Sequence, residues 1–236
     1  LKATEDMYWG KDGNAITDLS LYGQLSAGVP GTVDGMVKAH EKYGKLSWKE
    51  LVQPAVNLAQ KGFKITEKQA HELTNKHDNF IKYNAKTNAL TSKSTWKEGD
   101  VLVQKDLANT LKLIQQKGRA GFYEGKTADL IVNEMKRGNG IISHEDLKQY
   151  QSVWRTPISG GYKGLKVISM PPPSSGGIAL ISLFQSIEGY PIQKWGFQAD
   201  STIQVMVEAE RRVYADRAEH LGDPDSVSYT HLRAHE

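Results

Sequence analysis

Two adjacent serines, Ser174 and Ser175, have a type and a setting that could do chemistry. They lie between a β-branched run ending at Ile168 and an apolar run beginning at Ile178, in the stretch "MPPPSSGG". A serine on a turn from strand to helix can be a nucleophile, but that motif is G-x-S-x-G, and here both glycines follow the serines. A phosphate cradle would need spaced glycines and a lysine at the helix start, which are absent.

A plain corner between strand and helix explains the same residues. Prolines end a strand because they cannot donate to its hydrogen-bond ladder, and a serine can cap the helix that follows. Gly176 and Gly177 would let the backbone of that helix approach a neighbour closely. The stretch therefore favours a structural corner over a nucleophile or an anion site.

The histidines of the sequence do not predict a metal site. The chain contains no H-E-x-x-H motif and no cysteine, so neither a zinc-protease helix nor a thiolate site is available. His144 follows Ser143, which reads as a helix cap, and an ordinary surface imidazole is expected there. We predict no cofactor, no metal ligand, and no catalytic or substrate-binding residue from the residue types.

One stretch near the C-terminus combines carboxylates and arginines and could suggest acid and base chemistry. The spacing is equally that of salt bridges within one helix, with Glu208 and Arg212 four residues apart. Exposed pairs of this kind are common and contribute little. We predict a solvated helix face for these residues: Glu208, Glu210, Arg211, Arg212, Asp216, Arg217 and Glu219.

Composition indicates one globular domain with a proper core, or two domains. The chain has 236 residues, 39% of them hydrophobic and 24% charged, with a formal net charge of +3. Basic residues are spread along the chain and do not alternate with aromatic ones, so no nucleic-acid partner is predicted. No apolar run approaches the roughly 20 residues that cross a bilayer, so no membrane span is predicted either.

Capping signals locate several helices. The S-x-x-E pattern and its variants occur at Ser47–Glu50, Thr66–Gln69 and Ser143–Asp146. Asp106 reads as a cap and Gly118 as a stop for a further helix. The sequence predicts a strand near residues 165–170 and helices at these ranges: 47–61, 106–117, 127–137, 175–188 and 202–221.

Three further features of the sequence add detail to the predicted helices and to the stretch between them. Pro54 removes a backbone donor inside the first helix, which predicts a kink or two short helices. The polar stretch 75–99 lacks periodicity and predicts a long irregular surface excursion. In the longest helix, spacing places these residues on one face, which is expected to be exposed in this chain alone: Ile203, Val207, Tyr214, Ala218 and Leu221.

Three segments, in this order, resemble the γ-glutamyltranspeptidases, also called glutathione hydrolases. They are "AGVPGTVDGMVKAHEKYGKLSWKELVQPAVNLAQKGF" (27–63), "RTPISGGYKGLKVISMPPPSSGG" (155–177) and "AERRVYADRAEHLGDPD" (209–225). The resemblance runs from about Lys2 to Asp225. The motifs in these segments, taken together and at this separation, are specific for the family. The resemblance implies an α+β, helix-rich part of the four-layer αββα sandwich of N-terminal-nucleophile hydrolases, within the large subunit of a precursor that cuts itself in two.

The resemblance also implies a reaction. A threonine at the new N-terminus of the small subunit attacks a γ-glutamyl amide, with its own amine as the base, and the acyl group passes to water or an amino acid. No position here matches that threonine, and the family's carboxylate-binding arginine precedes Lys2. We therefore expect residues 1–226 to be a single incomplete domain of the large subunit. Expressed alone, the chain is expected to be inactive and not to form a stable compact monomer.

The remaining expectations also rest on the resemblance. The implied partner is the small subunit of the same precursor, and the implied location in a bacterial parent is the periplasm or the medium. One alternative is a related acylase of the cephalosporin or glutaryl type, because the residues that select the acyl group lie elsewhere. Another is a non-catalytic helical binding module. Residues 227–236 resemble a translated sequencing adapter, which predicts a non-native tail without functional histidines.

Overall fold

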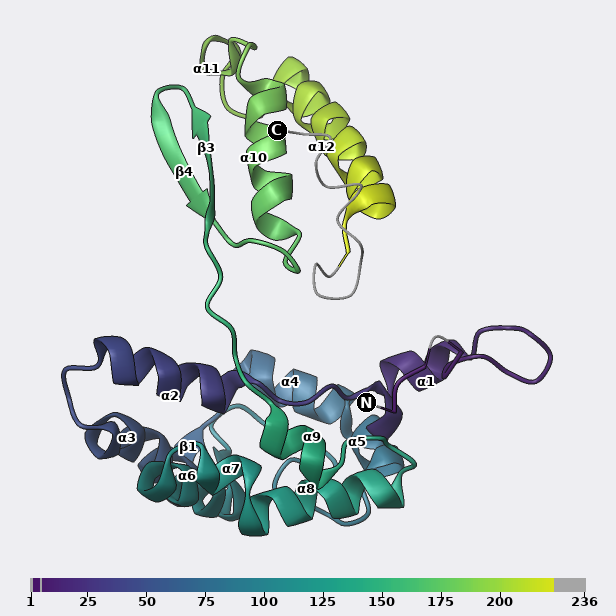
Figure 1. Ribbon diagram of the computed structural model, residues 1–236, viewed down its shortest axis with the longest axis vertical. Coiled ribbons are helices and arrows are strands. Elements are labelled where there is room, and N and C mark those ends of the chain that lie inside the picture. The colour runs from purple at the N-terminus through teal and green to yellow at the C-terminus, as the bar shows by residue number, and fades with distance from the viewer. Residues whose placement is uncertain (1, 5, 223–236) are drawn as a thin grey trace. The chain divides into compact units, whose positions relative to one another are not determined.

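The chain divides into two compact units. A computed structural model describes residues 2–4 and 6–222, and the units are Leu1–Val153 and Trp154–Glu236 (Figure 1). We call them the first and the second unit. The assignment of one incomplete domain to residues 1–226 stays a prediction, and the tail at 227–236 lies outside the described residues.

The first unit is mainly helical, with one short antiparallel strand pair in which Phe63 faces Leu102. Helices α3 and α6 pack side by side and make its most extensive interface (Figure 1). Its elements are α1 (Thr17–Leu21), η1 (Gln24–Ser26), α2 (Thr32–Tyr43), α3 (Trp48–Lys61), β1 (Phe63–Lys64), α4 (Glu67–Asn75), α5 (His77–Tyr83), β2 (Val101–Leu102), α6 (Lys105–Lys117), α7 (Ala120–Tyr123), α8 (Gly125–Arg137) and α9 (His144–Gln149).

Two apolar clusters hold the first unit together. The larger joins α2, α6, α7, α8 and α9, and its buried residues are Val33, Ile114, Tyr123, Ala128, Val132, Met135, Ile142 and Leu147. The smaller lies around Trp96 and includes Ile65, Ala70 and Leu102. Burial of this many apolar side chains is the main stabilising contribution to the first unit.

The second unit is a β-hairpin with helices against it. Strands β3 (Ile158–Tyr162) and β4 (Leu165–Ser169) pair antiparallel, and Lys163 and Gly164 between them both have positive φ, as a two-residue hairpin turn requires. Helix α10 (Gly176–Ile187) packs on the hairpin and on α12 (Asp200–His220), and α11 (Ile192–Trp195) packs on α12 (Figure 1). Gly160 permits α10 to pack on the hairpin, since a Cβ at Gly160 would lie 2.6 Å from Ile181 Cγ2.

The predicted elements are confirmed with small shifts at their ends. All three capping boxes are formed, at Ser47, Thr66 and Ser143. Helices α3, α6, α8, α10 and α12 and strand β4 occupy the expected ranges to within about two residues. The expectation for Asp106 is wrong, because α6 begins one residue earlier and Asp106 lies in its first turn.

Two other local expectations are corrected. Helix α3 is not split in two at Pro54, because a helix can lose one internal hydrogen bond where packing holds both sides. The stretch 75–99 is not irregular throughout, since α5 lies within it. Trp96 anchors the stretch to the first unit, because its side chain is buried and its backbone N–H donates to Thr74 Oγ1 at 2.9 Å.

The predicted exposure of one face of α12 is confirmed in the described part of the second unit. Ile203, Val207 and Tyr214 are 48%, 54% and 56% exposed. The buried residues of α12 are Thr202, Ala209 and Val213, which lie on another face of the helix. Smaller side chains let α12 approach α10 closely, and the bulkier stripe is left uncovered in the part of the unit that the structure describes.

The two units are expected to differ in stability when the chain is expressed alone. In the described part of the second unit the only buried apolar side chains are Ala179, Ala209 and Val213, too few to offset the entropy of ordering it. We therefore assign the expected failure to form a compact monomer to this unit. Amide hydrogen exchange should be about tenfold or more slower in α3 and α6 than in α10 and α12. Equal protection in both units would contradict this assignment.

Candidate functional site

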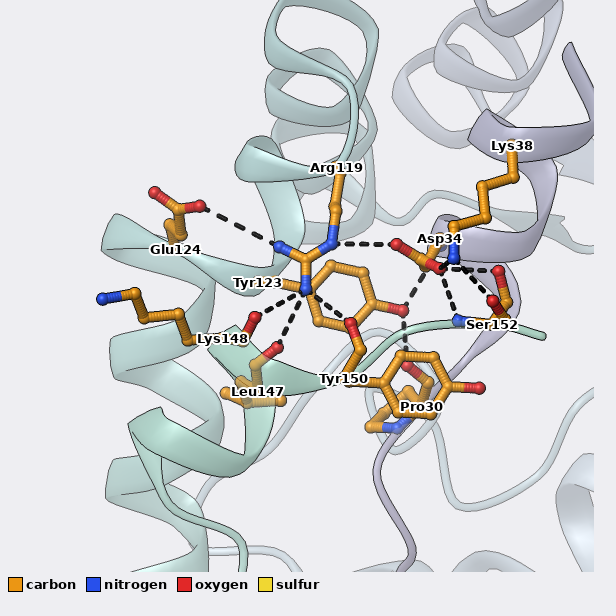
Figure 2. A network of polar contacts seen from close by, with 10 residues as sticks. All are labelled: Pro30, Asp34, Lys38, Arg119, Tyr123, Glu124, Leu147, Lys148, Tyr150 and Ser152. Atoms are coloured by element: carbon orange, nitrogen blue, oxygen red, sulfur yellow. Dashed lines mark hydrogen bonds and ion pairs between the residues drawn. The ribbon is translucent and has the colours of Figure 1, made fainter. Parts of the chain in front are cut away.

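A cluster of polar contacts in the first unit surrounds Asp34 (Figure 2). Asp34 lies in the first turn of α2 and is only 2% exposed. Its Oδ1 accepts a hydrogen bond from Arg119 Nε at 2.8 Å, and its Oδ2 accepts from the Ser152 backbone N–H at 2.7 Å and from Ser152 Oγ at 2.6 Å. Lys38 Nζ lies 3.5 Å from Oδ2. The buried carboxylate is thus paired with cations and hydrogen-bonded, as its burial requires.

Arg119 extends the cluster to the last turn of α9 and to Tyr150, which follows it. Its Nη2 donates to the carbonyl oxygen of Lys148 at 2.8 Å and to that of Tyr150 at 2.6 Å. The guanidinium also lies 4.7 Å from the centre of the Tyr123 ring, within reach of a cation–π interaction. One planar side chain therefore joins α2, α7 and the segment after α9 (Figure 2).

Tyr123 closes the cluster on the side of the "VPG" stretch. Its hydroxyl donates to the Pro30 carbonyl oxygen at 2.6 Å and accepts from the Asp34 backbone N–H at 3.3 Å. Its ring stacks on that of Tyr150 with centroids 5.9 Å apart. Gly31 must be glycine for this arrangement, because a Cβ there would lie 2.0 Å from the Tyr150 hydroxyl oxygen.

This cluster is built to hold the chain rather than to react. No buried side-chain nitrogen or oxygen among the described residues lacks a partner. Both Asp34 oxygens are occupied, and neither Asp34 nor Arg119 lines the cavity beside Leu73 or the one beside Gly121. The residue types gave no local signal for the cluster, since Asp34 and Arg119 are 85 residues apart.

Acid is expected to weaken the Asp34 cluster. Burial raises the pKa of the Asp34 carboxyl, but hydrogen bonds from Ser152 and Arg119 and the charge of Lys38 lower it by more. The pKa of the folded state therefore lies below its usual value of about 3.9. A depressed folded pKa contributes stability that is present above the unfolded pKa and is lost as pH falls through the folded pKa.

The measurement is urea unfolding of the chain and of its Asp34→Asn variant at a series of pH values. The difference in unfolding free energy between them should be largest near neutral pH and should shrink as the pH falls below about 4. A difference that stays constant down to the acid limit would contradict the assigned role of the Asp34 charge.

The serine pair lies at a structural corner in the second unit. Ser174 Oγ accepts a hydrogen bond from the Gly176 backbone N–H at 3.3 Å, so Ser174 satisfies one amide at the start of α10. The Ser175 hydroxyl makes no cap bond to α10 and accepts instead from Arg217 Nε at 2.8 Å. A Cβ on Gly177 would lie 2.1 Å from the Met170 carbonyl oxygen, which confirms the close backbone approach.

Replacing these serines should therefore have small effects. Ser174→Ala and Ser175→Ala are each expected to cost about 1 kcal/mol or less of stability, because each removes one exposed hydrogen bond. In a complete precursor, turnover should persist in the double variant. Complete loss of acyl-enzyme formation in a folded double variant would instead make one of the serines a nucleophile.

The other residues singled out in the sequence lie on the surface. The carboxylates and arginines of α12 form a solvated face as predicted, although Glu208 pairs with Arg211 at 2.7 Å and not with Arg212. His144 Nε2 lies 2.8 Å from Asp129 Oδ1 on an exposed face. Residues 2–4 and 6–222 contain no group of three potential metal ligands. Within the same residues, no helix has the length and apolar character to cross a membrane.

Comparison with known proteins places the chain in a family. Residues 1–235 match the family model described as Gamma-glutamyltranspeptidase. The chain is 43% identical over 229 residues to a glutathione hydrolase proenzyme of Pseudomonas sp. (strain A14), covering 96% of this chain and 40% of that protein. It is also 33% identical over 233 residues to an acylase ACY 1 proenzyme of Pseudomonas sp. (strain V22), covering 96% of this chain and 42% of that protein.

A solved structure agrees with this placement. The γ-glutamyltranspeptidase of Helicobacter pylori superimposes with a TM-score of 0.93 at 44% sequence identity, over 97% of this chain and 66% of that one. The chain therefore belongs to the γ-glutamyltranspeptidase family, an enzyme family with the N-terminal-nucleophile hydrolase fold. The α+β, helix-rich fold class is confirmed. The chain spans about 40% of the length of the curated relatives it matches.

Proposed function

We propose that the protein to which this chain contributes transfers γ-glutamyl groups from glutathione and similar amides to water or to an amino acid. The observation that carries the proposal is the family match over residues 1–235, together with the glutathione hydrolase proenzymes that align along nearly the whole chain. The chemistry follows the family reaction, in which a threonine oxygen attacks the γ-carbonyl carbon, its amine accepts the proton, and the leaving amine departs.

In this proposal the chain acts as large-subunit scaffold, and the nucleophilic threonine comes from the small subunit of the same precursor. The uncovered apolar stripe of α12, formed by Ile203, Val207 and Tyr214, supports such a partner, because a stripe of this kind is normally buried against another element. The inactivity of the isolated chain is part of the proposal. Export of the complete precursor in a bacterial parent is a further part of the proposal. Fractionation of parent cells tests it.

Transfer of an acyl group other than γ-glutamyl is the second candidate function. It rests on the acylase ACY 1 proenzyme, which aligns with 96% of the chain at 33% identity. Both candidates are acyl transfers on the same fold, and they differ in the acyl group selected. The higher identity to glutathione hydrolase proenzymes favours the γ-glutamyl group.

Expression of the complete parent gene tests the proposal. We expect a precursor that cleaves itself into two subunits and then hydrolyses a γ-glutamyl anilide faster than a glutaryl anilide. The reverse preference would favour the acylase. A full-length product that folds, stays uncleaved and hydrolyses neither anilide would favour a non-catalytic binding protein.

A further inference from the structure

The segment 148–152, which ends the first unit, is attached in an unusual way. It follows Leu147, the last fully buried residue of the larger apolar cluster, and beyond the end of α9 at Gln149 it forms neither helix nor strand. Only Tyr150 and Ser152 in the segment are partly buried. The apolar contact of the segment is therefore limited to the Tyr150 ring, which packs against the cluster and stacks on Tyr123.

Charged side chains supply most of its attachment. Arg119 donates to the carbonyl oxygens of Lys148 and Tyr150, and Asp34 accepts from both the backbone N–H and the hydroxyl of Ser152. Lys38 Nζ donates to the Ser152 carbonyl oxygen at 2.5 Å (Figure 2). These contacts pair backbone N–H and C=O groups of the segment, which a neighbouring strand or helix would otherwise pair.

The hydrogen bonds between α3 and α6 do not involve this cluster. Trp48 Nε1 donates to the Ile114 carbonyl oxygen at 2.9 Å, and Gln115 Nε2 donates to the Lys49 carbonyl oxygen at 2.9 Å. These bonds join α3 to α6 directly. The interface between the two helices can therefore survive the loss of the segment.

We propose that Asp34 and Arg119 form a latch that fastens segment 148–152 to the first unit, and that this segment detaches locally when the latch is broken while α3 and α6 stay folded. The latch acts at the last residues of the first unit, immediately before the second unit begins at Trp154. It is a conformational device, and it stands on the geometry of the first unit alone, independent of the proposed activity.

Amide hydrogen exchange of the whole 236-residue chain, followed by mass spectrometry, tests the latch. The two variants are Asp34→Asn, which removes the charge, and Arg119→Lys, which keeps the charge but loses the fork that reaches two carbonyls. Matched controls are Asp106→Asn, at an exposed position in α6, and Arg137→Lys, whose partners are Glu134 and the Tyr83 carbonyl oxygen.

In both latch variants, amides of residues 148–153 should exchange about tenfold or more faster than in their controls, because hydrogen bonds to charged groups are lost. Amides in α3 and α6 should exchange more slowly than those of the segment in every variant, because these helices stay folded when the segment detaches. Trypsin should cut after Lys148 faster by a similar factor. Ser152→Ala should shift both readouts in the same direction by less, since it keeps the backbone N–H.

Two results would overturn the latch. One is exchange of residues 148–153 at equal rates in the latch variants and their controls. The other is loss of protection across α3 and α6 together with the segment, which would make the cluster a part of the global core and not a local fastening.

Discussion

The 236-residue chain, purified by itself, is expected to release no anilide from a γ-glutamyl anilide above the uncatalysed rate. The family reaction needs a threonine hydroxyl as nucleophile and that residue's free amine as base, and the family resemblance places both outside these residues. Without them, attack and proton transfer are lost together, and residual positioning cannot replace a missing nucleophile. This is the largest effect that we predict.

A matched comparison separates this absence from misfolding. The same chain produced within its complete precursor should hydrolyse the anilide after self-cleavage, whereas the isolated chain should stay inactive even where exchange data show its first unit folded. Measurable hydrolysis by the isolated, homogeneous chain would show that a nucleophile lies among its own residues, and Ser174 and Ser175 would be the first to test.

Replacement of Arg119 by methionine is expected to destabilise the first unit by about 1.5–3 kcal/mol. The change removes the cation that is hydrogen-bonded to Asp34, which is 2% exposed, and leaves Lys38 Nζ, 3.5 Å from Oδ2, as its remaining cation. The loss is destabilising because the desolvation of the buried carboxylate is then only partly offset. Urea unfolding followed by a first-unit signal measures this cost.

The control for this prediction is Arg137→Met. Arg137 is 41% exposed and pairs with Glu134 at 2.6 Å, so its loss should cost about 1 kcal/mol or less. The double variant Asp34→Asn with Arg119→Met should recover part of the lost stability, because no uncompensated charge remains. Equal costs for the two arginine variants would mean that the Asp34 pair contributes no more than a surface salt bridge.

The helix starts and the strand that depend on neighbouring residues were predicted from the sequence. The capping boxes at Ser47, Thr66 and Ser143 fixed the starts of three helices, because such caps act within four residues. The run 165–170 predicted β4, whereas its partner β3 went unrecognised because Gly160 and Gly161 weaken a strand signal. Helix α2 also gave no clear signal, since its N-cap is Gly31 without a side-chain bond.

What depended on distant residues could not be predicted. The buried face of α12 is set by the fit of Ala209 and Val213 against α10, and not by the bulk of Ile203 or Tyr214. The Asp34–Arg119 pair joins residues far apart in sequence, and neither has a motif that predicts burial. The absence of catalytic and substrate-binding residues from this chain stays a prediction.

A chimeric precursor gives the most direct test of the central claim, that this chain can serve as a γ-glutamyltranspeptidase large-subunit scaffold. Residues 2–222 would replace the aligned stretch of the glutathione hydrolase proenzyme of Pseudomonas sp. (strain A14), and self-cleavage and anilide hydrolysis would be measured. We predict two subunits and hydrolysis of a γ-glutamyl anilide in preference to a glutaryl anilide. A folded chimera that neither cleaves itself nor hydrolyses the γ-glutamyl anilide would contradict the claim.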